Sequence, residues 1–79
     1  MQKAFVLINT DPGCEGEVLK GLKRIEGVEQ AYATYGVYDI VVRVQAESPD
    51  KLKEVITQHI RRLDKVRSTL TMIITEELR

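Results

Sequence analysis

ATYGVYDIVVRV, residues 33–44, decides the fold because it predicts a β-hairpin. A glycine stands between two tyrosines, and an aspartate then opens a run of β-branched residues. Gly36-Val37 fits a two-residue turn of the Gly-X kind, since glycine tolerates a positive φ at the first turn position. The stretch therefore predicts two antiparallel strands, one over residues 30–35 and the other over residues 38–46. The carboxylate of Asp39 at the head of an apolar strand needs an explanation of its own.

The register of this hairpin follows from the faces that it creates. On one face the pairs are Tyr35 with Tyr38, Ala33 with Ile40 and Ala31 with Val42. On the other they are Thr34 with Asp39, Tyr32 with Val41 and Gln30 with Arg43. The first face is uniformly apolar and the second is mixed, and a slip by one residue would scramble both.

Further elements are predicted on both sides of the hairpin. Residues 3–9, KAFVLIN, read as a strand that is covered on both faces. Asp11-Pro12 is expected to open a helix that Gly27 ends. Ser48-Pro49-Asp50 repeats this start signal for a second helix, with Lys65 near its end. The apolar stripes are Val18, Leu19, Leu22 and Ile25 in the first helix, and Leu52, Val55, Ile56, Ile60 and Leu63 in the second.

Residues 67–75 predict the last strand because they alternate. The side toward the helices would hold Leu70, Met72 and Ile74, and the other side Thr69, Thr71, Ile73 and Thr75. The element order is then β-α-β-β-α-β. Two right-handed crossovers give an α+β, ferredoxin-like sandwich, with a four-stranded antiparallel sheet and both helices on one face. Residues 1–79 are expected to form a single domain.

The charge balance excludes broad classes of partner. Twelve Lys and Arg residues balance twelve Asp and Glu residues, so the net charge is 0 and no field attracts a polyanion. The sheet also lacks the two or three aromatic residues on which RNA-binding domains of this fold stack bases. Apolar runs are too short to cross a membrane, and no signal peptide opens the chain. We therefore expect a cytoplasmic protein that binds neither nucleic acid nor membrane directly.

One face of the predicted sheet has no element of this chain to cover it. Its apolar residues are expected to be Phe5, Leu7, Tyr32, Val41 and Ile73. Each large aliphatic side chain left in water forgoes about 1.5–3 kcal/mol of burial, and several together rival the stability of a small domain. The sequence therefore predicts a homodimer in which sheet faces sheet.

Residues for catalysis or metal binding do not converge in the sequence. One cysteine and one histidine, without a C-x-x-C pair, leave no metal signature. Cys14 would need a base to act as a nucleophile, and His59 lies on a different element, midway along the second helix. We expect no catalytic residue, no metal site and no cofactor.

A site for a small zwitterion is one prediction for the hairpin. Asp39 shares the non-helix face with Thr34, and Thr69 and Thr71 are expected on the corresponding face of the last strand. Gly36 permits close approach to the N–H groups of the turn. A free amino acid needs a carboxylate for its ammonium, and N–H and hydroxyl donors for its own carboxylate. A cross-strand polar pair between Asp39 and Thr34 explains the same residues equally well.

The motifs together resemble a known family. They are DPG before GEVLKGLKRIEGV, then TYGVYDIVVRV, a helix opened by SPD, and VRSTLTMIIT. This series, over residues 3–75, is similar to the C-terminal effector domain of the Lrp/AsnC transcriptional regulators, also called the RAM domain. Its most specific element is Gly36-x-Tyr38-Asp39.

The resemblance implies an αβ-sandwich that dimerises through its sheets and assembles dimers into rings of eight or ten subunits. It also implies an amino acid effector, bound where dimers meet. The ligand residues that it singles out are Gly36, Tyr38 and Asp39, then Thr69 and Thr71, with Thr34 and Tyr35 adjacent.

The chain departs from the family pattern at its N-terminus. The regulators carry a helix-turn-helix arm, whereas this sequence starts at the first strand, so direct DNA binding is not expected. A stand-alone effector domain could instead join hetero-assemblies with full-length relatives. An ACT-like domain, using Gly13 after the first strand, is one alternative. A dimeric αβ-barrel enzyme, with His59 or a carboxylate in a polar pocket, is another.

Overall fold

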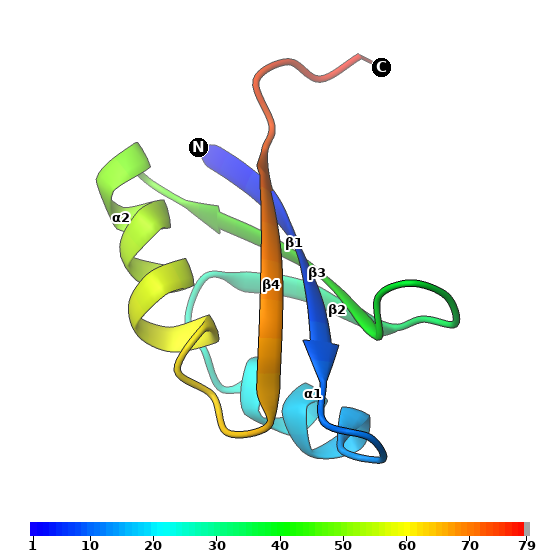
Figure 1. The fold of residues 1–79 in the computed structure, drawn as a ribbon. Helices are drawn as coiled ribbons and strands as arrows, with labels where there is room; N and C mark the ends of the chain where they lie inside the picture. The colour runs from blue at the N-terminus through cyan, green and yellow to red at the C-terminus, as the bar shows by residue number, and fades with distance from the viewer. Residues whose placement is uncertain (79) are drawn as a thin grey trace.

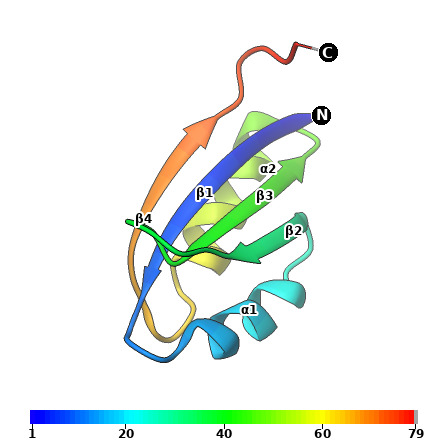
Figure 2. The same cartoon turned by 90° about the vertical axis from the view of Figure 1, so that its right-hand side faces the viewer.

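The structure is a computed structural model and describes residues 1–78. Its elements are β1 (Gln2–Thr10), α1 (Glu15–Lys23), β2 (Val28–Ala33), β3 (Ile40–Ala46), α2 (Pro49–Glu54), the π-helical segment η1 (Val55–Ile60) that continues it, and β4 (Val66–Ile73). The strands pair antiparallel in the order β2-β3-β1-β4, which confirms the predicted ferredoxin-like α+β fold. Figure 1 shows α2 on one side of the sheet, and Figure 2 looks onto the opposite side.

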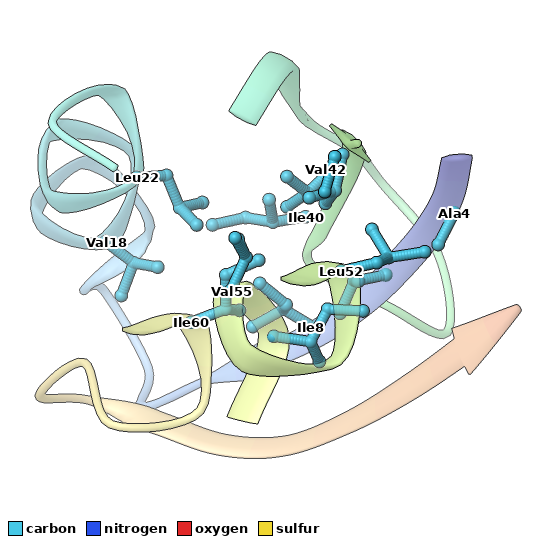
Figure 3. Packing of buried hydrophobic residues seen from close by; sticks show 13 residues of the cluster. Ala4, Ile8, Val18, Leu22, Ile40, Val42, Leu52, Val55 and Ile60 are labelled. Atoms are coloured by element: carbon cyan, nitrogen blue, oxygen red, sulfur yellow. The ribbon is translucent and has the colours of Figure 1, made fainter. Parts of the chain in front are cut away.

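One apolar cluster fills the space between the sheet and the helices. It contains Ala4, Val6 and Ile8 from β1, Ile40, Val42, Val44 and Ala46 from β3, Val18 and Leu22 from α1, and Leu52, Val55, Ile56 and Ile60 from the second helix (Figure 3). Alternate residues of β1 and β3 enter this cluster because side chains along a strand point to opposite faces. All the buried helix residues belong to the two predicted stripes. β4 contributes no residue to the cluster.

The register of the central hairpin is the predicted one. The pairs are Ala31 with Val42, Tyr32 with Val41, Ala33 with Ile40 and Gln30 with Arg43. A bulge between Val28 and Gln30 leaves Glu29 outside the ladder. Glu29 Oε1 lies 3.2 Å from Arg43 Nε, so the two residues form an ion pair. Arg43 Nε makes no well-aligned hydrogen bond, either to Glu29 or to another described residue.

The two helices begin differently although their start signals are alike. Ser48 caps α2 as predicted, since its Oγ accepts a hydrogen bond from Lys51 N at 3.1 Å. α1 begins only at Glu15, and the prediction that Asp11 caps it is wrong. Gly13 has a φ of 78°, a left-handed conformation that closes a turn instead of continuing into a helix.

Both helices also end earlier than predicted. α1 ends at Lys23 rather than near Gly27, and the second helix ends at Ile60. Lys65 then takes a left-handed φ of 75° in the turn before β4. Its carbonyl oxygen accepts a hydrogen bond from Asp11 N at 2.8 Å, which joins the turn after β1 to the turn before β4.

A second bulge lies at the start of β4. Thr10 pairs with Val66 but Asn9 pairs with Ser68, so Arg67 is an extra residue outside the ladder. Regular alternation from Val66 would place the even-numbered residues of β4 on the helix side, as predicted from the sequence. The extra residue moves the odd-numbered ones there instead.

The faces of β4 beyond this bulge are therefore the opposite of those predicted. On the helix side the pairs are Thr69 with Ile8, Thr71 with Val6 and Ile73 with Ala4. On the open side they are Leu70 with Leu7 and Met72 with Phe5. The prediction that Thr69, Thr71 and Ile73 lie on the open side is wrong, because the β1 partners of all three are buried in the apolar cluster.

Two glycines predict losses of different size for the same substitution to alanine. A Cβ at Gly27, where φ is 104°, would lie 3.1 Å from Gln45 O and 3.3 Å from Val55 Cγ2. We expect Gly27→Ala to lower the free energy of unfolding by about 1–3 kcal/mol. At Gly36 no atom lies within 4 Å of that position, so Gly36→Ala carries only the strain of a φ of 159° and should lower the free energy of unfolding less than Gly27→Ala does. Chemical denaturation measures both values, and equal losses would contradict the steric argument.

Candidate functional site

The open side of the sheet is apolar at its centre. Six residues from all four strands form this open-face patch: Phe5, Leu7, Tyr32, Val41, Leu70 and Met72. Tyr32, Leu70 and Met72 each leave about half of their surface exposed. The patch contains every predicted interface residue except Ile73, which lies on the helix side of β4, and Leu70 and Met72 take its place.

The connection between β2 and β3 is longer than predicted. It spans residues 34–39 rather than Gly36-Val37 alone. The expected pairing persists at its base, because Thr34 N donates to Asp39 O at 2.8 Å. Thr34 Oγ1 donates a hydrogen bond to Tyr38 O at 2.7 Å, and this bond links the two ends of the loop.

The tip of this loop stands away from the rest of the chain. Gly36 has a φ of 159°, which is positive but is not the value that the first position of a two-residue Gly-X turn requires. Tyr35 and Val37 on either side of it are almost fully exposed. The loop projects on the side of the sheet opposite α2, to the right in Figure 1 and toward the viewer in Figure 2.

Asp39 stands where the loop meets the end of β1. Its backbone N donates to Ile8 O at 2.9 Å. Its carboxylate Oδ2 accepts a hydrogen bond from Thr10 N at 2.9 Å, and Thr10 Oγ1 lies 3.5 Å away. The side chain pairs with Thr10 rather than with Thr34, so the cross-strand polar pair is not formed through this carboxylate. Oδ2 is thus engaged, whereas Oδ1 accepts no hydrogen bond from residues 1–78.

A polar hollow of about 430 Å³ lies beside this carboxylate. It is lined by Asn9, Thr10, Asp39, Arg67 and Ser68. Small-molecule sites in proteins have volumes of about 300–1,000 Å³, so the hollow can take a small ligand. It presents an anionic side chain and a cationic one to the same space, together with an amide and hydroxyls.

The predicted ligand residues fall into two separate groups. The hairpin loop holds Thr34, Tyr35, Gly36, Tyr38 and Asp39. Thr69 and Thr71 lie on the helix side of β4, opposite to the side on which the loop projects. Thr71 Oγ1 is buried there, and no hydrogen bond to it is found within residues 1–78. The structure therefore does not bring the two threonines together with the hairpin residues.

Four residues of the polar hollow were missed by sequence reasoning: Asn9, Thr10, Arg67 and Ser68. Asn9 and Thr10 did carry a signal, because they are the polar pair that closes the apolar run of the first strand. Arg67 carried none, since a one-residue bulge leaves the spacing of apolar residues unchanged on either side of it.

The rest of the described chain offers no catalytic arrangement. Cys14 is partly buried with its Sγ 3.7 Å from Pro12 O, and His59 is exposed on η1. His59 lines an open groove of about 590 Å³ near Gly27, on the helix side, among side chains of both charges. Within residues 1–78 no three His, Cys, Asp or Glu residues group closely enough to hold a metal ion. Among the described helices, none has the length and apolar character to cross a membrane.

The alternative of an αβ-barrel enzyme is not supported by this arrangement. It requires a polar pocket under the sheet with His59 or a carboxylate inside it, whereas the apolar cluster fills the space between the sheet and the helices and the groove that His59 lines is open to solvent. The described residues instead offer an apolar sheet face left open, a projecting loop and a charged hollow, which are features suited to association and to the binding of a small ligand.

The family model of the Lrp/AsnC ligand binding domain matches residues 3–79, and the chain belongs to this family. An uncharacterized HTH-type transcriptional regulator from Pyrococcus furiosus is 30% identical over 73 residues, which cover 89% of this chain and 49% of the regulator. The chain thus spans about half the length of the curated relatives that it matches first. The family match replaces the ACT-like alternative.

Two solved structures show the same fold. The crystal structure of FFRP-DM1 is 38% identical with a TM-score of 0.89, and the match covers 94% of this chain and 99% of that one. A feast or famine regulatory protein from M. tuberculosis, solved in complex with L-methionine, is 31% identical with a TM-score of 0.80. That match covers 100% of this chain and 53% of the other protein.

Proposed function

We propose that this chain binds a free amino acid at the hairpin and the polar hollow, and that it acts as a regulatory domain within an assembly. The carboxylate of Asp39 carries the proposal, because Thr10 fixes one of its oxygens and leaves the other for a ligand ammonium. The M. tuberculosis relative that was solved with L-methionine supports an amino acid as the class of ligand.

The proposed ligand site contains the hairpin residues Thr34, Tyr35, Gly36, Tyr38 and Asp39. Gly36 has no atom within 4 Å of the Cβ position, so a ligand or a second subunit can approach the backbone there. Thr34 acts through the loop, because its hydroxyl already donates to Tyr38 O. Thr69 and Thr71 are left out of the site because they lie on the other side of the sheet.

The second part of the proposal is a homodimer that packs open-face patch against open-face patch. Fully burying a large apolar side chain contributes about 1.5–3 kcal/mol, and the patch supplies six apolar side chains from each copy that are only partly buried in that copy. Projecting hairpins then place the ligand site where one dimer meets another. Dimers assemble further into an even oligomer, an octamer or a decamer.

The regulatory part of the proposal concerns a partner. Full-length relatives carry a DNA-binding region in addition to the half that this chain matches, as the HTH-type regulator of P. furiosus illustrates. A shared sandwich domain gives such a regulator and this chain the same open-face patch. We propose that the chain modulates transcription by hetero-assembly with a full-length Lrp/AsnC regulator.

Asp39→Asn tests the ligand site without removing the bond that holds the loop. The amide oxygen still accepts from Thr10 N, but the side chain no longer offers a charge to an ammonium. In a thermal-shift screen against the twenty amino acids, a ligand at about 100 times its Kd stabilises by about 2.7 kcal/mol, or roughly 10 °C for a domain of this size. We expect the wild type to show such a rise with at least one amino acid and Asp39→Asn to lose most of it.

Asp50→Asn is the matched control, because Asp50 is an exposed acid on α2, which lies on the side of the sheet opposite the hairpin loop (Figure 1). It should respond like the wild type. If the melting temperature of Asp39→Asn rises with the amino acid as much as that of the wild type, Asp39 has a structural role alone. If no amino acid shifts the wild type, the ligand proposal is wrong.

A further inference from the structure

We propose that Arg67 and Asp39 hold the two ends of the ligand, so that the site selects amino acids whose ammonium and carboxylate are both free. This inference rests on the amino acid binding proposed above and names the group that receives the ligand carboxylate. The hairpin residues supply no cationic side chain, whereas the polar hollow contains one.

The bulge at the start of β4 presents this arginine. Asn9 pairs with Ser68 and Thr10 with Val66, so Arg67 has no partner across the ladder. A bulged residue is released from the alternation of its strand, and bulges often turn one side chain toward a site. Here the residue that the ladder leaves out lines the same hollow as Asp39.

The guanidinium is available for a ligand. Its only ion pair within residues 1–78 is with Asp11, and the distance between Arg67 Nε and Asp11 Oδ1 is 3.8 Å. Charge-assisted N–H···O bonds have lengths of about 2.7–2.9 Å, so this contact is not one of them. The side chain of Arg67 is 64% exposed. A ligand carboxylate can therefore form the bidentate pair that Asp11 does not form.

The opposite end of the hollow suits an ammonium. Asp39 Oδ2 is held by Thr10 N, while Oδ1 is left without a protein donor in residues 1–78. Asn9 Nδ2 and Ser68 Oγ, at a separation of 3.5 Å, form a neutral polar wall with no charge of its own. A ligand with only one charged end would satisfy one of the two side chains and leave the other unpaired.

The test compares three probes by isothermal titration calorimetry on the full chain. They are L-methionine, its carboxamide, which lacks the carboxylate, and N-acetyl-L-methionine, which lacks the ammonium. If the thermal-shift screen selects another amino acid, that amino acid and its two blocked forms replace them. We expect the wild type to bind the free amino acid about tenfold or more tightly than either blocked form.

Arg67→Gln then decides the role of the arginine. It should weaken binding of the free amino acid about tenfold or more. Binding of the carboxamide should stay unchanged, because that probe has no carboxylate for Arg67 to bind. Asp39→Asn should likewise weaken binding of the free amino acid, but it should leave binding of the N-acetyl form unchanged, because that probe has no ammonium for Asp39 to bind. Arg61→Gln, at an exposed arginine just after η1, is the matched control and should bind like the wild type.

Asp11→Asn separates a ligand role from a structural one. If Arg67 binds the ligand, loss of the competing Asp11 charge should leave affinity unchanged or raise it a few-fold. If Arg67 acts only by pairing with Asp11, both substitutions should weaken binding equally, and the inference is wrong. Equal affinity of wild type and Arg67→Gln for the free amino acid also overturns it while leaving the proposed function intact. A wild type that binds no amino acid overturns both.

Discussion

Met72→Lys is expected to convert the assembly into monomers of 9.0 kDa at micromolar concentration. Met72 pairs with Phe5 at the open-face patch and has 47% of its surface exposed in the single chain. A two-fold interface contains the substitution twice, and each Met72 has only about half of its surface left to bury, so the lost burial is about 1.5–3 kcal/mol, or about ten- to a hundredfold in the dimer Kd. Burial of the two ammonium groups adds a further cost. Size-exclusion chromatography with light scattering measures the mass.

Ile73→Lys is the matched control, and it separates the structure from the sequence prediction. Ile73 is the next residue of β4 and is 51% exposed, but it pairs with Ala4 on the helix side. The substitution adds the same charge at nearly the same exposure and should leave the oligomer mass unchanged. Dissociation of both variants, or a monomeric wild type, would rule out the open-face patch as the interface.

Ile8→Ala is expected to lower the free energy of unfolding by about 2–5 kcal/mol. Ile8 is fully buried on a central strand, with Ile40 on one side and Thr69 on the other. A chain of this length has a total stability of about 4–12 kcal/mol, so the variant should lose at least about 10 °C in melting temperature. Circular dichroism at fixed protein concentration measures it, since the melting temperature of an oligomer depends on concentration.

Leu7→Ala is its matched control on the opposite face of the same strand. Leu7 belongs to the open-face patch, so its loss should weaken association more than it weakens the fold of one copy. The melting temperature of Leu7→Ala should therefore depend more steeply on protein concentration than that of Ile8→Ala. A loss below about 1 kcal/mol for Ile8→Ala would contradict the packing described for the apolar cluster.

The predictable part of the fold lies where burial differs sharply between two faces. β3 is a central strand under the helices, so the contrast between the two faces of the hairpin determined its register and its part of the core. Edge strand β4 contributes no fully buried residue to the apolar cluster, only Val66 packs against it, and Leu70, Met72 and Ile73 are all about half exposed. Hydrophobicity therefore could not choose between its faces. Regular alternation from Val66 then assigned the residues after Arg67 to the wrong faces, because the sequence does not reveal the bulge.

The candidate site shows a similar division. Asp39 was predicted because it stands at a hairpin and points away from the helices. Its partner Thr10 is 29 residues away in the sequence, and only the pairing of β1 with β3 brings the two together. Arg67 depends on three further features: the bulge, the left-handed Lys65 and the bond from Asp11 N to Lys65 O. Each of these is a backbone feature that depends on tertiary contacts and has no signal in the local sequence.

The bulge at Arg67 has a consequence for how the domain can diverge. Because Arg67 has no partner in the ladder, a substitution at position 67 disturbs no cross-strand pair of side chains. An insertion or deletion after Ser68 would instead reverse the phase of the residues that follow and replace Leu70 and Met72 by threonines at the patch. Ligand preference and subunit association can thus evolve separately, although the residues that control them are neighbours on one strand.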